Sequence, residues 1–123
     1  MKLSIVIPAY NEARTIHLIL NKVKAVKLIH DIEKELIIVN DCSSDNTEES
    51  ILHYQQANPE LSISYYKHEI NKGKGAAIHT GIQQATGDLV IIQDADLEYD
   101  PEEFNILLKP FVNGVADVVL QAL

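Results

Sequence analysis

Two aspartates separated by one small residue, Asp94 and Asp96, are the feature of this sequence that most directly suggests chemistry. They follow the apolar run 89–92, and in an extended backbone residues i and i+2 project to the same side. Neighbouring carboxylates supply the hard oxygen ligands of Mg²⁺ or Mn²⁺, and no adjacent histidine or cysteine favours zinc. Such a metal would keep coordination positions for phosphate oxygens. The alternative is a solvated acidic turn, since Asp-x-Asp is a short motif.

A second polar cluster, residues 8–12, follows the apolar run 3–7. Part of it has a structural explanation, because Pro8 can end a strand while Asn11 and Glu12 suit the start of a helix. Tyr10 is explained less well in that way. An aromatic ring in a short loop offers a face on which a nucleobase can stack.

Asp41 and the lysine-glycine segment 71–75 are the remaining polar groups that could contact a nucleotide. Asp41 follows an apolar run and either forms a turn or accepts a hydrogen bond from the N–H of a base. Lys72 and Lys74, each followed by glycine, form either a solvated loop or a phosphate site that combines charge with backbone N–H groups. The spacing matches neither a P-loop nor the glycine fingerprint of dinucleotide oxidoreductases.

The net charge and the cysteine and histidine content limit which partners and metal sites the chain can have. Acidic residues outnumber basic ones by 18 to 10, and the resulting net charge of −8 disfavours nucleic acid. An acidic protein that binds a diphosphate needs a metal ion or aimed N–H groups. Cys42 is the only cysteine, which excludes an internal disulfide and favours a cytoplasmic location, and the five histidines lack metal-ligand spacing.

Segments of strand length alternate with segments of helical periodicity along all 123 residues. This alternation predicts one α/β domain, residues 1–123, with a mostly parallel Rossmann-like sheet and helices on both faces. The predicted strands are residues 3–7, 36–39, 61–66, 89–92 and 117–120. Ligands of open parallel sheets bind outside the carboxyl ends of the strands, so the polar clusters should converge at one edge.

The helices have recognisable limits in the sequence. Asn11 is predicted to cap the first helix, and Gly87 to end the helix that follows the lysine-glycine segment. In that helix the residues predicted to face the sheet are Ala77, Ile78, Gly81, Ile82 and Ala85, and the small ones among them permit close approach.

The order and spacing of these motifs resemble family 2 glycosyltransferases of the GT-A fold, and within that family the dolichyl- and polyprenyl-phosphate sugar transferases. The resemblance rests on the following segments: Ile5-Val6-Ile7-Pro8-Ala9-Tyr10-Asn11-Glu12, Ile38-Val39-Asn40-Asp41-Cys42-Ser43-Ser44-Asp45, Asn71-Lys72-Gly73-Lys74-Gly75 and Gln93-Asp94-Ala95-Asp96. Together they cover most of the chain.

The resemblance implies a metal-dependent enzyme that transfers sugar from a UDP- or GDP-sugar, usually with inversion, to a polyprenyl phosphate or a saccharide. It implies a donor pocket lined by Pro8, Ala9, Tyr10, Glu12, Asp41, Lys74, Gly75, Asp94 and Ala95. Asp94 and Asp96 would hold Mg²⁺ or Mn²⁺. The family takes its general base from a later segment, so no catalytic base is assigned here.

Two departures from the family pattern qualify this reading. Asn40 and Cys42 stand where the family often has aspartate and glycine. The sequence also stops at Leu123, after the fifth expected strand and before the acceptor-binding half of the family, so this fragment alone is expected to bind donor without turning it over. A lipid-phosphate acceptor would bring the full-length protein to the inner face of the membrane.

Two alternatives stay open at this point. One is a non-catalytic nucleotide-sugar-binding or assembly module, with the unfinished sheet edge as the surface of a homodimer. The other is a receiver-like phosphorylation domain, since those domains also place acidic residues at strand ends. The second alternative explains neither Tyr10 nor the lysine-glycine segment.

Overall fold

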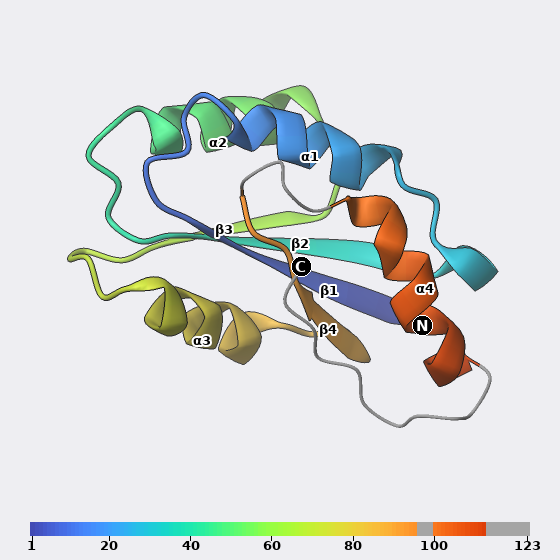
Figure 1. Cartoon of the computed structure of the whole chain (residues 1–123). Coiled ribbons are helices and arrows are strands. Elements are labelled where there is room, and N and C mark those ends of the chain that lie inside the picture. Colours follow the sequence, from blue (N-terminus) through green and yellow to red (C-terminus); the bar gives the residue numbers. More distant parts are fainter. Residues whose placement is uncertain (96–99, 113–123) are drawn as a thin grey trace.

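Four parallel strands form the central sheet, in the order β3-β2-β1-β4 (Figure 1). They are β1 (Lys2–Ala9), β2 (Glu33–Asn40), β3 (Ile63–Lys67) and β4 (Leu89–Ile92). The computed structural model describes residues 1–95 and 100–112, so the strand predicted at 117–120 lies outside the described part. Within the described part, the α/β class and the parallel sheet are confirmed.

Helices cover both faces of the sheet, as predicted (Figure 1). They are α1 (Ile16–Ala25), α2 (Thr47–Ala57), α3 (Lys74–Gln84) and α4 (Phe104–Val112), with short 3₁₀ turns at Ile29–Asp31 and Pro101–Glu103. α1, α2 and α4 share one hydrophobic cluster with the sheet, and α3 packs on the opposite face. No helix in the described ranges is long and apolar enough to cross a membrane.

The central strands are apolar on both faces because both faces are covered. Ile5 points toward α1 and α2, whereas its neighbour Val6 points toward α3. Ile5 lies opposite Leu36 of β2 and Ile91 of β4, and all three side chains are buried. This register aligns the carboxyl ends of the strands and brings the loops that follow them to one edge.

α3 approaches β1 closely because small residues face the sheet. Ala77 and Gly81 are buried, and a Cβ built on Gly81 would lie 2.3 Å from Cγ1 of Val6. The prediction that Ile82 also faces the sheet is wrong, since its side chain is 36% exposed. Neighbouring residues on a helix differ in direction by about 100°, so residues 81 and 82 cannot both face the strand.

The predicted helix cap at Asn11 is wrong. α1 begins at Ile16, and Asn11 instead adopts a left-handed conformation with φ of 53°. Its side-chain Oδ1 accepts a hydrogen bond from the N–H of Ser44 at 2.8 Å. Asparagine tolerates this conformation better than most residues, so its role here is to link two loops.

The predicted helix stop at Gly87 is wrong as well. α3 ends at Gln84, and the N–H of Gly87 donates to Oγ of Ser4 on β1 at 2.8 Å. A Cβ on Gly87 would lie 2.6 Å from that oxygen and 2.8 Å from the carbonyl oxygen of Lys2. Glycine is required there for close backbone approach.

Candidate active site at the carboxyl edge of the sheet

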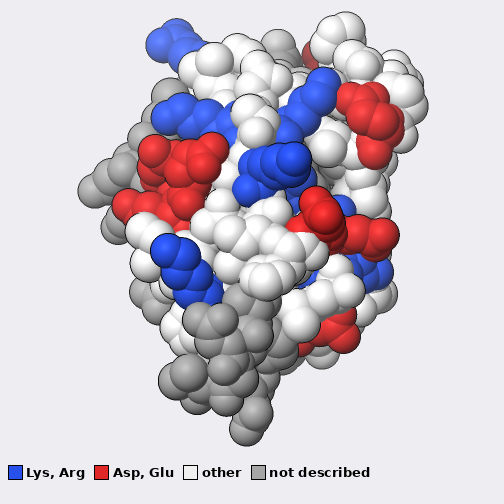
Figure 2. Space-filling model, turned by 90° about the vertical axis from the view of Figure 1, so that its right-hand side faces the viewer, with Lys and Arg blue, Asp and Glu red and all other residues white. Residues whose placement is uncertain are grey.

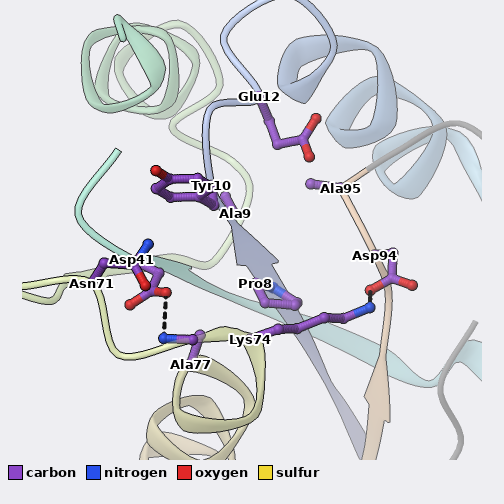
Figure 3. A pocket seen from close by; sticks show the side chains of 11 residues that line it. Pro8, Ala9, Tyr10, Glu12, Asp41, Asn71, Lys74, Ala77, Asp94 and Ala95 are labelled. Atoms are coloured by element: carbon purple, nitrogen blue, oxygen red, sulfur yellow. Dashed lines mark hydrogen bonds and ion pairs between the residues drawn. The ribbon is translucent and has the colours of Figure 1, made fainter. Parts of the chain in front are cut away.

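A pocket of about 340 Å³ opens at the carboxyl edge of the sheet, within the size range of small-ligand sites (Figure 3). It is lined by Pro8, Ala9, Tyr10, Glu12, Asp41, Asn71, Gly73, Lys74, Ala77, Asp94 and Ala95. These residues follow or flank the ends of all four described strands, as the sequence predicts. Of the predicted site residues, Gly75 does not line the pocket, and Asp96 lies outside the described part of the chain.

Hydrogen bonds from backbone N–H groups fix the loops after β1 and β2 against each other. The N–H of Asn11 donates to Oγ of Ser43 at 3.0 Å, and the N–H of Asp41 donates to the carbonyl of Ala9 at 2.9 Å. Tyr10 lies between these anchored positions with 48% of its surface exposed. Its ring therefore stands at the pocket wall on a fixed backbone, available to a ligand (Figure 3).

The Asp41 side chain is only 4% exposed, and its carboxylate makes three hydrogen bonds in this buried position. Oδ1 accepts from the N–H of Lys72 and contacts Nδ1 of His68, both at 2.8 Å. Oδ2 accepts from the N–H of Gly73 at 2.8 Å. Burial would raise the pKa of Asp41, but these hydrogen bonds outweigh it, and the pKa lies below its ordinary value. The carboxylate thus stays ionised and holds the lysine-glycine loop in place.

His68 supports Asp41 through a contact between Nδ1 and the carboxylate, a role that the sequence did not reveal. It is buried, and its Nε2 lies 2.8 Å from Oγ1 of Thr80 on α3. An ionised carboxylate only accepts hydrogen bonds, so Nδ1 of His68 carries the proton that points to Asp41. The only available signal was the position of His68 directly after β3, where binding loops gather.

Asn40 and Cys42, which differ from the family's usual residues after the second strand, each have a local structural explanation. Asn40 is buried, donates from Nδ2 to the Tyr65 hydroxyl at 3.0 Å, and accepts at Oδ1 from the N–H of Ser43 at 3.0 Å. The Tyr65 hydroxyl donates in turn to Glu48 at 3.1 Å. An aspartate at position 40 could not donate to Tyr65. Cys42 adopts φ of 57°, so it occupies the left-handed conformation that glycine takes more readily.

Asp94 and Lys74 form an ion pair across the pocket, with 2.6 Å between Nζ and Oδ1 (Figure 3). The Asp94 side chain is 17% exposed and that of Lys74 is 61% exposed. The carboxylate oxygens of Asp94 are hard ligands of the kind that Mg²⁺ and Mn²⁺ prefer, and a metal ion would have to displace Lys74 from Oδ1. Within residues 1–95 and 100–112, no three His, Cys, Asp or Glu side chains converge as a complete metal site.

The amino end of α3 closes the side of the pocket that carries Lys74. Gly73, with φ of 95°, turns the chain into the helix, and Lys74 and Gly75 are its first residues. Apart from adjacent residues and the backbone of α3 itself, no heavy atom of the described residues lies within 4 Å of a Cβ built on Gly73 or Gly75. A helix amino end carries partial positive charge and unpaired N–H groups, so this side of the pocket suits an anion.

The chain has relatives among enzymes named for lipid-phosphate acceptors. It is 40% identical over 118 residues to an undecaprenyl-phosphate 4-deoxy-4-formamido-L-arabinose transferase from Photorhabdus laumondii. It is 36% identical over 112 residues to a dolichyl-phosphate beta-glucosyltransferase from Trichomonas vaginalis. The alignments cover 96% and 87% of this chain. They cover 36% and 34% of the relatives, so the chain spans about a third of their length.

Solved structures with the GT-A fold share this architecture. A mannosyltransferase from Pyrobaculum calidifontis, in complex with GDP-Man and Mn²⁺, superposes with a TM-score of 0.73 at 25% identity, covering 82% of this chain and 29% of that chain. TarS from S. aureus, in complex with UDP-GlcNAc, superposes with a TM-score of 0.74 at 28% identity, covering 93% and 32%. The sequence model of glycosyl transferase family 2 matches residues 4–123. On the evidence of its motifs, its fold and these relatives, the chain belongs to glycosyl transferase family 2.

Proposed function

We propose that the pocket binds a nucleoside-diphosphate sugar and that the protein transfers the sugar to an acceptor. The main support for this proposal is that one cavity is lined both by groups that can bind a base and by groups that can bind a diphosphate with its metal ion. Tyr10 and Asp41 suit a nucleobase, whereas Lys74 and Asp94 suit a diphosphate and its counter-ion. A receiver-like phosphorylation domain is wrong for this chain, because residues 4–123 match the glycosyltransferase family.

The base-binding side is proposed to use stacking and one charge-assisted hydrogen bond. The exposed ring of Tyr10 gives the base a flat apolar surface. The ionised Asp41 carboxylate, which lines the same cavity, accepts from a base N–H. Pro8, Ala9 and Glu12 form the adjoining wall.

The diphosphate is proposed to lie against the amino end of α3, near Lys74 and Gly75. Lys74 is exposed enough to exchange Asp94 for a phosphate oxygen. Asp94 and Asp96 would hold Mg²⁺ or Mn²⁺, and that ion would neutralise charge on the departing diphosphate. The presence of Mn²⁺ in the structure of the mannosyltransferase supports this assignment.

The proposed reaction is a single displacement with inversion at the anomeric carbon. An acceptor oxygen forms the new bond to that carbon as the bond to the diphosphate oxygen breaks, and the diphosphate leaves with the electron pair. A polyprenyl phosphate is the favoured acceptor, since the relatives' names specify lipid phosphates and a phosphate is already an anion. It needs no general base, whereas a saccharide hydroxyl would need one. Such an acceptor would place the protein at the inner face of a membrane.

The first test is calorimetric titration with UDP- and GDP-sugars, with and without Mn²⁺. Asp94→Asn should weaken the Mn²⁺-dependent binding at least about tenfold, equivalent to ~1.4 kcal/mol, because a neutral amide is a poorer ligand for the ion. Asp96→Asn should do the same. Asp31→Asn is the matched control, since Asp31 is exposed and precedes β2 at the opposite edge of the sheet. Unchanged Mn²⁺ dependence in both site variants would refute the proposed metal site.

A second measurement separates an enzyme from a binding module. Acceptor-dependent release of nucleoside diphosphate, with a polyprenyl phosphate as acceptor, is expected if the protein is an enzyme. Donor binding without any such release would favour the non-catalytic module.

A further inference from the structure

We propose that Gln93 is a positioning residue for the metal site, because its buried side chain holds the backbone from which the Asp94 carboxylate projects. The inference rests on the proposed binding of a metal ion by Asp94, and it adds a residue that does not itself line the pocket. Two observations carry it. Gln93 makes a hydrogen bond to the backbone of Asp94, and its own amide oxygen is buried without a partner among the described residues.

Gln93 directly follows β4, at a position where the packing calls for an apolar side chain. It is fully buried, and its N–H continues the sheet by donating to the carbonyl of Val6 at 2.9 Å. Side chains alternate between the two sides of an extended strand. Ile91 and Ala95, two positions before and after, belong to the hydrophobic cluster that the sheet shares with α1, α2 and α4. Gln93 therefore lies on the core side, whereas the Asp94 carboxylate faces α3 across the pocket (Figure 3).

The amide of Gln93 uses only part of its hydrogen-bonding capacity there. Nε2 donates to the backbone carbonyl oxygen of Asp94 at 3.2 Å. Oε1 is buried, and no donor among the residues that the structure describes reaches it. A buried amide oxygen without a hydrogen bond lowers stability relative to an apolar side chain of the same shape. The fold alone would be served better by methionine or leucine, and a polar group kept against that preference is typical of a functional site.

The hydrogen bond from Gln93 acts on the direction in which Asp94 projects. A peptide group is planar, so holding the carbonyl oxygen of Asp94 fixes the orientation of the peptide that joins it to Ala95. Thr15, just before α1, adds a weaker contact to the next carbonyl, with 3.5 Å between its Oγ1 and the oxygen of Ala95. The backbone of Asp94 is thus held by the sheet before it and by side chains after it. Groups that orient a metal ligand in this way change metal affinity by about tenfold or more.

The test replaces the amide and measures metal-dependent binding and stability separately. Gln93→Met keeps an unbranched side chain of similar length and removes the hydrogen bond. UDP, or GDP where GDP binds more tightly, is titrated into the chain at a subsaturating concentration of Mn²⁺ and again in EDTA. The Kd in Mn²⁺ should rise about tenfold, whereas the Kd in EDTA should stay unchanged. The midpoint of urea denaturation should be equal to that of the natural chain or higher.

Two further variants guard against an effect of packing alone. Gln93→Leu, a second apolar replacement, should behave as Gln93→Met does. Ile91→Val is the matched control, since it removes a methyl group from the same core cluster and leaves the contact to Asp94 in place. It should lower the urea midpoint and retain the natural Kd in Mn²⁺.

The contrary results are distinguishable. An unchanged Kd in Mn²⁺ for either apolar variant, or equal losses of affinity in Mn²⁺ and in EDTA, would overturn the role of Gln93 and leave the proposed function intact. A lower urea midpoint in both apolar variants would also overturn it, because the amide would then be needed by the fold. Absence of Mn²⁺-dependent binding by the natural chain would overturn the proposed metal site itself.

Discussion

The Asp41 carboxylate holds the lysine-glycine loop in place and also lines the candidate ligand pocket. The sequence offers a turn former and a base ligand as alternatives. The Asp41 carboxylate instead holds the distant lysine-glycine loop, and the contact within its own turn is made by Asn40, whose Oδ1 accepts from the N–H of Ser43. Its position in the pocket wall keeps the second role open. A substitution at Asp41 would therefore disturb the loop and the ligand together, whereas Tyr10 offers a cleaner way to test the base site.

Replacing Tyr10 with alanine should weaken UDP binding by about 1–3 kcal/mol, the usual worth of stacking one base on an aromatic side chain. Tyr10→Phe keeps the ring and should bind UDP nearly as well as the natural chain. Because the side chain is 48% exposed, neither change should lower the midpoint of chemical denaturation appreciably. Titration calorimetry measures both variants, and equal affinity for alanine and phenylalanine at this position would exclude stacking.

At the scale of elements, the position of α3 determines where Gly73, Lys74 and Ala77 stand in the pocket wall. Gly81 brings the helix against Val6 of β1, and the amino end of the same helix carries Lys74. Thr80, also on α3, holds His68 and through it Asp41. A change in the packing of α3 would therefore shift both Lys74 and Asp41, which line the same pocket.

Gly81→Ala should destabilise the chain by about 1–3 kcal/mol, the usual penalty for overpacking a filled core. The added Cβ would lie 2.3 Å from Cγ1 of Val6, so one of the two elements must shift. Gly75→Ala is the matched control in the same helix, because, apart from adjacent residues and the backbone of α3 itself, no heavy atom of the described residues lies within 4 Å of its added Cβ. Urea denaturation gives both values, and a Gly81→Ala chain as stable as Gly75→Ala would contradict this account of the packing.

In the whole molecule, the two edges of the sheet at the strand ends have different contents. The carboxyl ends of the strands hold the pocket, whereas the amino ends hold a buried carboxylate, Glu35, among Lys2, Ser4 and Thr86. Viewed from the side where the chain begins, acidic and basic side chains are interspersed rather than gathered into a field of one sign (Figure 2). With a net charge of −8, affinity for a diphosphate must come from local groups in the pocket.

Glu35 should make the folding stability depend on pH below neutrality. Burial would raise its pKa, but hydrogen bonds from Thr86, Lys2 and Ser4 outweigh it and lower the pKa from 4.5 to about 2. A lowered pKa in the folded state stabilises the chain at pH values above the unfolded-state pKa. That stabilisation is lost as the pH falls from about 4.5 through about 2.

Glu35→Gln should therefore reduce the free energy of unfolding at pH 7 by about 2 kcal/mol and flatten its decline in acid. Chemical denaturation at a series of pH values from 7 to about 2.5 measures this. Glu33→Gln, at an exposed position of the same strand, is the control and should retain the natural pH profile. A Glu35→Gln chain that loses stability in acid as steeply as the natural chain would show that another group is responsible.

Residue types and their order along the chain were enough to predict the parallel sheet and the place of the site. Apolar runs fix where strands form, and parallel strands necessarily gather their carboxyl ends, so the polar residues after each run meet at one edge. Tyr10, Asp41, Lys74 and Asp94 do line one pocket. The family resemblance held for the same reason, because its motifs are these strand ends. Asp96 and the fifth strand lie outside the described residues and stay predictions.

Only the tertiary structure determined which groups touch. Asp41 and His68 are 27 positions apart, and Ser4 and Glu35 are 31 apart, so no local periodicity connects them. Asn11 and Gly87, predicted as helix boundaries, are used instead for contacts between distant segments. Secondary structure follows local patterns, whereas hydrogen bonds between loops depend on how the packed elements bring distant backbone together.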